Sequence, residues 1–168
     1  MELVSRMMDG SISYSTGGGL EPSSSGAGTS QDDKIDRLEK VPIFAGCSRR
    51  QLRAVAKIAG VFDAPPGMVL TRAGEPGNQF FLIVDGTTRV EVSPKKQTRL
   101  GAGDYFGEMS LLDGEPRSAT VIAETPLRLL MISRRHFATL LNEVPGLTQN
   151  ILATLSRRVR QAERALYG

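Results

Sequence analysis

The sequence predicts a mainly β fold with flanking helices. Short apolar and β-branched runs follow one another closely between residues 61 and 132, and Gly and Pro separate them. Helical periodicity appears before and after this region, in residues 32–58 and 134–166. Closely spaced strands with such turns indicate a β-sandwich or a closed roll. A chain of 168 residues with 40% hydrophobic content has enough apolar side chains for one core.

Residues 1–31 are predicted to be a disordered tail. Ser, Gly and Thr dominate this segment, so it offers too little apolar surface to offset the entropy lost on ordering. The alternative is that Met7, Met8 or Tyr14 docks over a ligand site as a lid or an autoinhibitor. The folded domain is therefore expected to comprise residues 32–168.

Two short helices are predicted before the strands. The first covers residues 32–40, with acidic residues early and Lys40 last, as the helix dipole prefers. The second opens at Ser48, and Gln51 three positions later completes a capping box. The apolar face of this second helix consists of Leu52, Val55, Ala56 and Ile58.

The strands predicted next are short and separated by turn signals rich in Pro and Gly. Five of them precede the segment discussed below, at residues 61–64, 68–72, 80–85, 87–92 and 98–100. Another begins at Arg117, and the last covers residues 127–132. In the fourth strand, apolar and polar residues alternate. Thr88, Val90 and Val92 form one face, and Thr87, Arg89 and Glu91 form the other.

Two helices are predicted after the strands. Ser133 caps a helix over residues 134–142, Val144-Pro145-Gly146 ends it, and the last helix covers residues 147–166. This last helix carries an apolar stripe of Ile151, Leu155, Val159, Ala162 and Leu166. Arg157, Arg160 and Arg164 form a different, basic face. The stripe either packs against the roll or serves as a mobile lid or a dimer seam.

The segment between residues 105 and 121 has the pattern of an anion pocket. Gly107 allows positive φ and close approach of a ligand, because it has no Cβ. Residues 108–112 favour a single helical turn that Asp113-Gly114 ends, and its free N–H groups point back at Gly107. Such a helix end attracts anions. Pro116 then returns the chain to an extended path, so that Arg117 faces the helical turn.

An arginine and a carboxylate in this pocket suggest a nucleotide. The planar fork of Arg117 matches two oxygens of a phosphate. Glu108 would repel that phosphate, so its expected partner is a hydroxyl donor such as a ribose 2′-OH. Phosphate and ribose together indicate a nucleotide. The alternative is an ordinary turn with a surface salt bridge between Glu108 and Arg117.

Residues 106–121, reading F-G-E-M-S-L-L-D-G-E-P-R-S-A-T-V, resemble the phosphate-binding cassette of the cyclic-nucleotide-binding domain family. This module occurs in cAMP-dependent kinase regulatory subunits, bacterial catabolite activators and nucleotide-gated channels. Residues 77–92 and 101–108 also resemble that family, and the resemblance covers about residues 35–166. It implies a jelly-roll β-roll with N-terminal helices, a short cassette helix and two C-terminal helices. A lid and a dimer seam are both known uses of the final helix in this family.

The resemblance also implies the ligand and its contacts. The expected ligand is cAMP, with cGMP bound more weakly, and no other cofactor is expected. By resemblance, Gly107, Glu108 and the amides of Met109 and Ser110 meet the ribose and phosphate. Arg117 and Ser118 meet the cyclic phosphate. Phe106 and Ala119 complete the candidate ligand-binding set. The bound state would be transmitted through the C-terminal helix, to a protein partner or within a homodimer.

An enzyme is not expected. His136 is the only histidine and falls within a predicted helix, so neither a Ser-His nucleophile nor a cupin-type set of histidine metal ligands is supported. No catalytic residue and no metal site are therefore predicted. The open alternative for this class is a phosphodiesterase that uses Glu108 as a general base. A second alternative is a ligand-free interaction or scaffold domain with the same fold.

The composition indicates in which compartment the protein is expected and which partners are not. Cys47 is the only cysteine, so no intramolecular disulfide is possible and a reducing cytoplasm is expected. The net charge of +3 is too small to suggest nucleic acid as a partner, and no helix-turn-helix is expected within these 168 residues. No apolar run has the length of a membrane span, so no membrane partner is expected.

Overall fold

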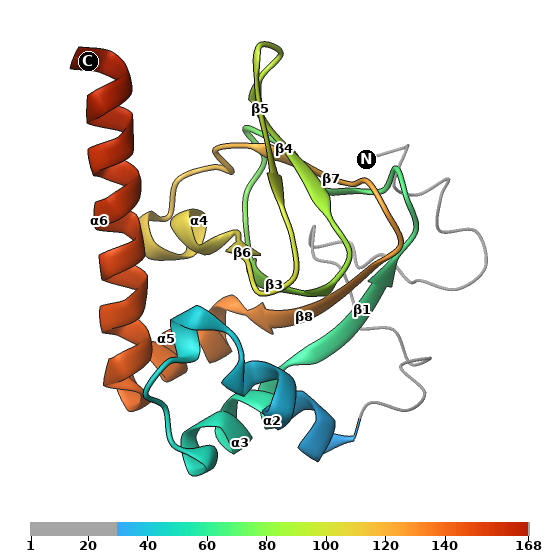
Figure 1. Ribbon diagram of the computed structural model, residues 1–168, viewed down its shortest axis with the longest axis vertical. Helices are drawn as coiled ribbons and strands as arrows, with labels where there is room; N and C mark the ends of the chain where they lie inside the picture. The colour runs from blue at the N-terminus through green and yellow to red at the C-terminus, as the bar shows by residue number, and fades with distance from the viewer. Residues whose placement is uncertain (1–29, 168) are drawn as a thin grey trace. The chain divides into compact units, whose positions relative to one another are not determined.

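The computed structural model describes residues 30–167, which form two compact units (Figure 1). One unit comprises residues 58–137 and contains the strands. The other comprises residues 30–57 and 138–167 and is helical. The alternative in which Met7, Met8 or Tyr14 docks over the site lies outside the described residues, as does the predicted tail apart from Ser30 and Gln31.

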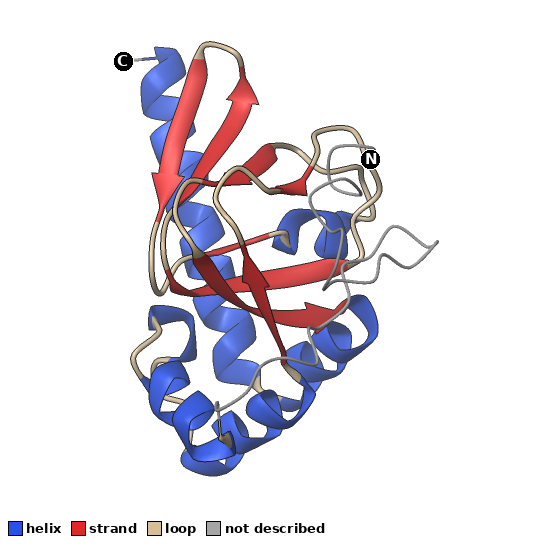
Figure 2. Cartoon of the chain, turned by 90° about the vertical axis from the view of Figure 1, so that its right-hand side faces the viewer, coloured by secondary structure: helices blue, strands red, loops and turns tan. Residues whose placement is uncertain are grey.

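The first unit consists of two four-stranded antiparallel sheets, drawn in red in Figure 2. Its strands are β1 (Gly60–Ala64), β2 (Val69–Thr71), β3 (Gln79–Asp85), β4 (Thr88–Ser93), β5 (Lys96–Leu100), β6 (Tyr105–Phe106), β7 (Thr120–Ala123) and β8 (Leu127–Ser133). The strand order is β1-β8-β3-β6 in one sheet and β2-β7-β4-β5 in the other. The prediction of a mainly β fold with flanking helices is confirmed. Only β6 was not predicted, because two residues are too few to show alternation.

The core of this unit lies between apolar side chains of both sheets. Its members are Phe62, Ala64, Met68, Leu70, Phe81, Ile83, Phe106, Val121, Ala123, Leu127, Leu129 and Met131. Phe62, Ile83 and Leu129 are fully buried. Apart from Met68, which precedes β2, these residues come from β1, β3, β6 and β8 in the first sheet and from β2 and β7 in the second, so the two sheets share one core.

Strand β4 confirms most of the predicted alternation and corrects one position. Thr88 is buried and Val90 packs against the core, as predicted. Val92 was predicted on the same inner face, yet 59% of its surface is exposed. The reason is that pairing of β4 with β7 ends at Glu91, so Val92 lies in the part of the hairpin that extends beyond the neighbouring strand.

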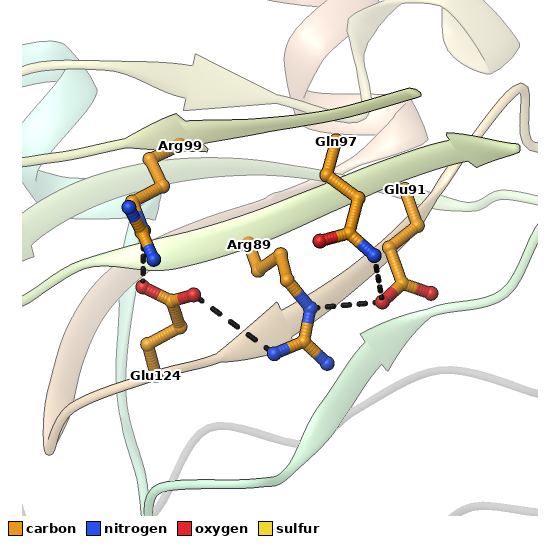
Figure 3. Close-up of polar contacts among 5 residues, drawn as sticks. All are labelled: Arg89, Glu91, Gln97, Arg99 and Glu124. Atoms are coloured by element: carbon orange, nitrogen blue, oxygen red, sulfur yellow. Dashed lines mark hydrogen bonds and ion pairs between the residues drawn. The ribbon is translucent and has the colours of Figure 1, made fainter. Parts of the chain in front are cut away.

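The polar face of β4 carries a network of charged side chains, drawn in Figure 3. Arg89 Nε lies 2.8 Å from a carboxylate oxygen of Glu91, which also accepts a hydrogen bond from the Gln97 amide. Glu124 lies 2.8 Å from Arg99 Nε and 3.9 Å from an Arg89 nitrogen. Each charge thus has an opposite charge beside it, within β4 for Arg89 and Glu91 and between neighbouring segments for Glu124 with Arg99 and Arg89.

The helical unit begins with three short elements, α2 (Gln31–Glu39), η1 (Pro42–Phe44) and α3 (Arg49–Ile58). Helix α2 begins one residue earlier than predicted, because Ser30 and Asp33 form a capping box. The predicted capping box of the second helix is confirmed. Ser48 N donates to the Gln51 side chain at 2.9 Å, and Gln51 N donates to Ser48 Oγ at 3.2 Å.

The remaining helices are α5 (Arg134–Glu143), which starts in the first unit, and α6 (Pro145–Tyr167). Helix α6 begins at Pro145, two residues before the predicted start. Proline fits the first helical position, where its missing N–H is not needed. Asn150 of α6 donates hydrogen bonds to the carbonyls of Ile43 and Ala45 at 2.8 and 3.1 Å.

The predicted apolar stripe of α6 is buried only at its start. Ile151 is 2% exposed and Leu155 is half-buried, whereas Val159 and Leu166 are 57% and 77% exposed. Leu152, on the same helix, is also exposed. Packing within the described residues therefore accounts for the first part of the stripe and not for the second.

Candidate functional site

The cassette, residues 106–121, contains the short helix α4 (Glu108–Asp113). Gly107 precedes it with φ 91° and Gly114 follows it with φ 72°, both in the left-handed region that glycine adopts at little cost. The Gly114 N–H donates to the Ser110 carbonyl at 3.1 Å and closes the helix. The predicted single turn over residues 108–112 is thus confirmed, with one additional residue.

Arg117 follows α4 and its main chain is held by the turn before β3. Its N–H donates to the Glu75 carbonyl, and its own carbonyl accepts from the Gly74 N–H, each at 2.8 Å. The strand predicted to begin at Arg117 begins three residues later, at Thr120. These two bonds therefore fix the position of Arg117 before the regular sheet starts.

The Arg117 side chain points back to the start of α4, as predicted. One terminal nitrogen donates to the Gly107 carbonyl and the other to the Gln79 carbonyl, both at 2.9 Å. Its Cζ lies 5.9 Å from the centre of the Phe81 ring. A guanidinium carries five N–H donors. Within residues 30–167, the bonds to two neutral carbonyls leave donor capacity for further oxygen atoms.

Two glycines make room for this guanidinium. A β-carbon on Gly77 would lie 2.4 Å from Arg117 Nε, closer than any real contact. A β-carbon on Gly107 would lie 2.8 Å from an Arg117 terminal nitrogen and 2.7 Å from the Gln79 carbonyl oxygen. Any other residue type at either position would displace the arginine or the chain around it.

The site is buried and positively charged. Burial lowers the pKa of Arg117 to about 10, Glu108 opposes this shift, and the charge of Arg134 adds to it. Arg117 is 9% exposed and Glu108 is 2% exposed. The alternative of a surface salt bridge between these residues is therefore wrong, because both side chains are buried.

The other predicted site residues divide into buried and exposed ones. Ser110 is buried, whereas Met109 and Ser118 are exposed and touch each other, with Ser118 Oγ 3.7 Å from the Met109 sulfur. The Phe106 side chain belongs to the core and stacks on Phe81 with ring centres 4.8 Å apart. The Ala119 carbonyl accepts a hydrogen bond from Thr71 Oγ1 at 3.1 Å.

Sequence reasoning missed three residues that shape the site, namely Gly77, Gln79 and Arg134. Gln79 contributes a main-chain carbonyl, which every residue has, so no signal in the sequence marks it. Gly77 begins the segment 77–92 that resembles the family, but no feature of the sequence shows that it packs against Arg117. Arg134 stands in the first turn of α5, where the helix dipole disfavours a cation, and this mismatch was a usable signal.

Among residues 30–167, no group of three or more His, Cys, Asp or Glu side chains could hold a metal ion. His136 is an exposed residue of α5, as predicted. No helix in this part combines the length and apolar character required to span a bilayer.

The two sheets, together with the short helix α4 and the arginine that points back to its start, define the class of protein. It is a two-sheet β-roll that carries a cassette. Residues 62–144 match the family described as the cyclic nucleotide-binding domain. The protein belongs to this family, so the resemblance found in the sequence is confirmed.

Curated relatives match over most of the described chain. A cyclic nucleotide-gated potassium channel of Rhizobium etli is 37% identical over 118 residues, which are 70% of this chain and 33% of the channel. A cAMP-dependent protein kinase regulatory subunit of Schizosaccharomyces pombe is 36% identical over 114 residues, covering 67% of this chain and 28% of the subunit. The chain thus spans a third or less of the length of these relatives.

Solved structures with the same fold include the catabolite activator protein of Thermus thermophilus. Its TM-score is 0.69 at 29% identity, covering 74% of this chain and 61% of that one. A cAMP-bound structure named PfPKA-R has a TM-score of 0.71 at 26% identity, covering 81% of this chain and 47% of that one. These neighbours confirm the predicted jelly-roll β-roll.

Proposed function

We propose that this chain is a regulatory module that binds cAMP, and cGMP more weakly, in its cassette. The observation that carries the proposal is the Arg117 guanidinium, which is buried between two glycines and bonded to two neutral carbonyls. A buried cation with spare donors favours an anionic ligand that replaces its lost hydration. The cAMP-bound structure of PfPKA-R, which has the same fold, supports cAMP as that anion.

The proposed contacts follow the cassette. Arg117 and Ser118 bind the cyclic phosphate, whereas Glu108 accepts a hydrogen bond from the ribose hydroxyl. Gly107 and the amides of Met109 and Ser110 meet the same part of the ligand. Phe106 supports the site from the core, and Ala119 follows the arginine at the other end of the cassette. The domain that carries this function comprises residues 32–168.

We further propose that α6 responds to the ligand. Val159 and Leu166 are exposed apolar residues of α6. A closed conformation that buried them would be stabilised relative to the open one. A nucleotide base also requires an apolar cover to be shielded from water. The closed helix would then present an altered surface to a protein partner, or to a second copy of the chain, in the cytoplasm.

The rival functions are a phosphodiesterase and a ligand-free scaffold. The first needs a general acid or base beside the phosphate, and Glu108 is assigned to the ribose instead. The second has no use for a buried arginine packed against two glycines, because a cation is costly to keep out of water. The binding function therefore accounts for more of the site than either rival.

Isothermal titration calorimetry of the full chain with cAMP and with cGMP tests the proposal. We expect saturable binding of both nucleotides at one site, tighter for cAMP, and chromatographically intact nucleotide after the titration. The Arg117→Ala variant serves as the matched control. Absence of binding in the parent chain would favour the scaffold, and nucleotide hydrolysis would favour the phosphodiesterase.

A further inference from the structure

Arg134 connects the cassette helix α4 with the turn before β3 through one nitrogen atom. Its guanidinium donates to the Gly77 carbonyl at 2.8 Å and to the Ser110 carbonyl at 3.2 Å. Its main-chain N–H donates to the Asn78 carbonyl at 2.8 Å. The first residue of α5 is therefore bonded both to the turn before β3 and to α4.

Both acceptors are important for the geometry around Arg117. Gly77 is the glycine whose α-carbon lies against the Arg117 guanidinium. Ser110 contributes one of the last four carbonyls of α4, where a cation is favoured by the helix dipole. A helix of six residues is unstable by itself, so it depends on such outside partners.

We infer that Arg134 is a positioning residue that caps the cassette helix from outside and fixes its distance from Gly77, so that Arg117 is held ready for the phosphate. Arg134 makes these bonds to carbonyls and does not itself contact the ligand. This inference rests on the proposed binding function, because it concerns the affinity of the same site.

The charge of Arg134, like its hydrogen bonds, favours the binding of a phosphate. Arg134 and Arg117 are close enough that the charge of one disfavours the charge of the other. An anion bound to Arg117 relieves that repulsion, so the charge of Arg134 strengthens the binding of a phosphate without touching it. A neutral residue at position 134 therefore removes a helix cap and an electrostatic contribution together, whereas lysine removes mainly the cap geometry.

The test compares the parent chain with Arg134→Gln, Arg134→Lys and the control Lys95→Gln. Lys95 is an exposed cation of the hairpin between β4 and β5, so its replacement changes the net charge equally. Titration with cAMP gives the affinity. Amide exchange followed by nuclear magnetic resonance, without nucleotide, reports the cassette helix through the Gly114 amide, which bonds to Ser110.

For Arg134→Gln we expect about ten- to a hundredfold weaker cAMP binding and faster exchange at Gly114. Exchange in the buried strands β3 and β8 should stay unchanged, which shows that the fold is intact. Arg134→Lys should recover only part of the affinity, because the lysine side chain is shorter and its nitrogen does not reach the place from which the Arg134 nitrogen bonds to both carbonyls. Lys95→Gln should bind cAMP within about twofold of the parent, since Lys95 and Arg134 are both exposed but only Arg134 bonds to the cassette helix and to the turn before β3.

Two results would overturn the inference. One is parent-like exchange at Gly114 in Arg134→Gln. The other is full recovery of affinity in Arg134→Lys while exchange at Gly114 stays faster than in the parent, which would reduce the role of Arg134 to charge alone. If the parent chain binds no cAMP, the proposed function fails, while the exchange comparison without nucleotide still decides whether Arg134 orders the cassette.

Discussion

The α-carbon of Gly77 lies against the side of the Arg117 guanidinium, where a β-carbon would be 2.4 Å from Nε. Gly77 belongs to the turn before β3 and Arg117 to the chain after α4, 40 residues later in the sequence. The turn therefore determines where the arginine of the cassette can be, although it contributes no side chain to the pocket.

Gly77→Ala is expected to weaken cAMP binding by about tenfold or more, because the fork of Arg117 must move from its place. Thermal stability should change much less, since the clash is with a side chain that can shift. Gly101→Ala is the matched control, because a β-carbon there meets nothing within 4 Å. Equal affinities of the two variants would contradict the role given to Gly77.

Arg117→Ala is expected to weaken cAMP binding by about 2–4 kcal/mol, roughly thirty- to a thousandfold, because a charge-assisted pair is lost from a shielded site. Arg117→Lys should recover only part of this loss, since an ammonium cannot form the planar fork. Calorimetric titration measures both variants. An Arg117→Ala affinity within about threefold of the parent would rule out the cassette as the phosphate site.

Affinity is expected to fall at high pH. Burial disfavours the charge of Arg117 and lowers its pKa in the folded chain to about 10, below the ordinary range of arginine. Binding of an anion needs the charged form, so affinity should be constant below that pKa and decline by up to about tenfold per pH unit above it. Titrations between neutral pH and the onset of alkaline unfolding measure this decline.

The same pKa shift has the opposite effect on folding. Between a pH of about 10 and the ordinary pKa of arginine, the unfolded chain holds this proton more strongly than the folded chain, so the contribution of Arg117 to stability rises with pH in that window. Arg117→Gln is the control for the affinity measurement, because glutamine does not titrate. A parallel decline of affinity in this variant would assign the pH dependence to another group.

The choice between cAMP and cGMP is expected to depend on Ser118. Its hydroxyl contacts only a weak acceptor, the Met109 sulfur, and is exposed, so it can turn to a ligand. By the family resemblance, Ser118→Thr should shift the affinity ratio toward cGMP and Ser118→Ala away from it. One hydrogen bond limits each shift to about tenfold. Competition titrations of cAMP and cGMP against the parent and both variants measure this ratio. An unchanged affinity ratio would mean that residues other than Ser118 select the base.

Ending the chain before Arg160 is expected to weaken cAMP binding by about 1–3 kcal/mol if α6 closes over the ligand. The removed part contains the exposed apolar residues Leu166 and Tyr167. In the full chain, saturating cAMP should slow amide exchange in residues 147–167. Arg117→Ala at the same nucleotide concentration serves as the control. Unchanged exchange in the parent chain would exclude the lid.

Much of the fold was predictable because its signals are local. Ser48 with Gln51 marked the start of α3, and Gly107 and Asp113-Gly114 marked the two ends of α4. Pro145 was interpreted only as the end of one helix, although it also begins the next. Val92 follows the alternation of its strand, and its exposure depends on where the neighbouring strand ends.

The site was predictable where side chains carry the chemistry and not where the main chain does. Arg117 and Glu108 stand out as charged residues around a glycine turn. The carbonyls of Gln79 and Glu75, which hold the side chain and the main chain of Arg117, have no signature in a sequence. Their positions follow from the pairing of distant segments, which only the folded chain defines.

Strand β5 forms the outer edge of the second sheet, and four of its five residues are exposed. An open edge of this kind invites other chains to add a strand, which is how many β proteins aggregate. Here the edge carries the cations Lys96 and Arg99, and a second copy would bring the same charges to the same edge. Like-charge repulsion thus protects the roll from edge-to-edge aggregation at high concentration.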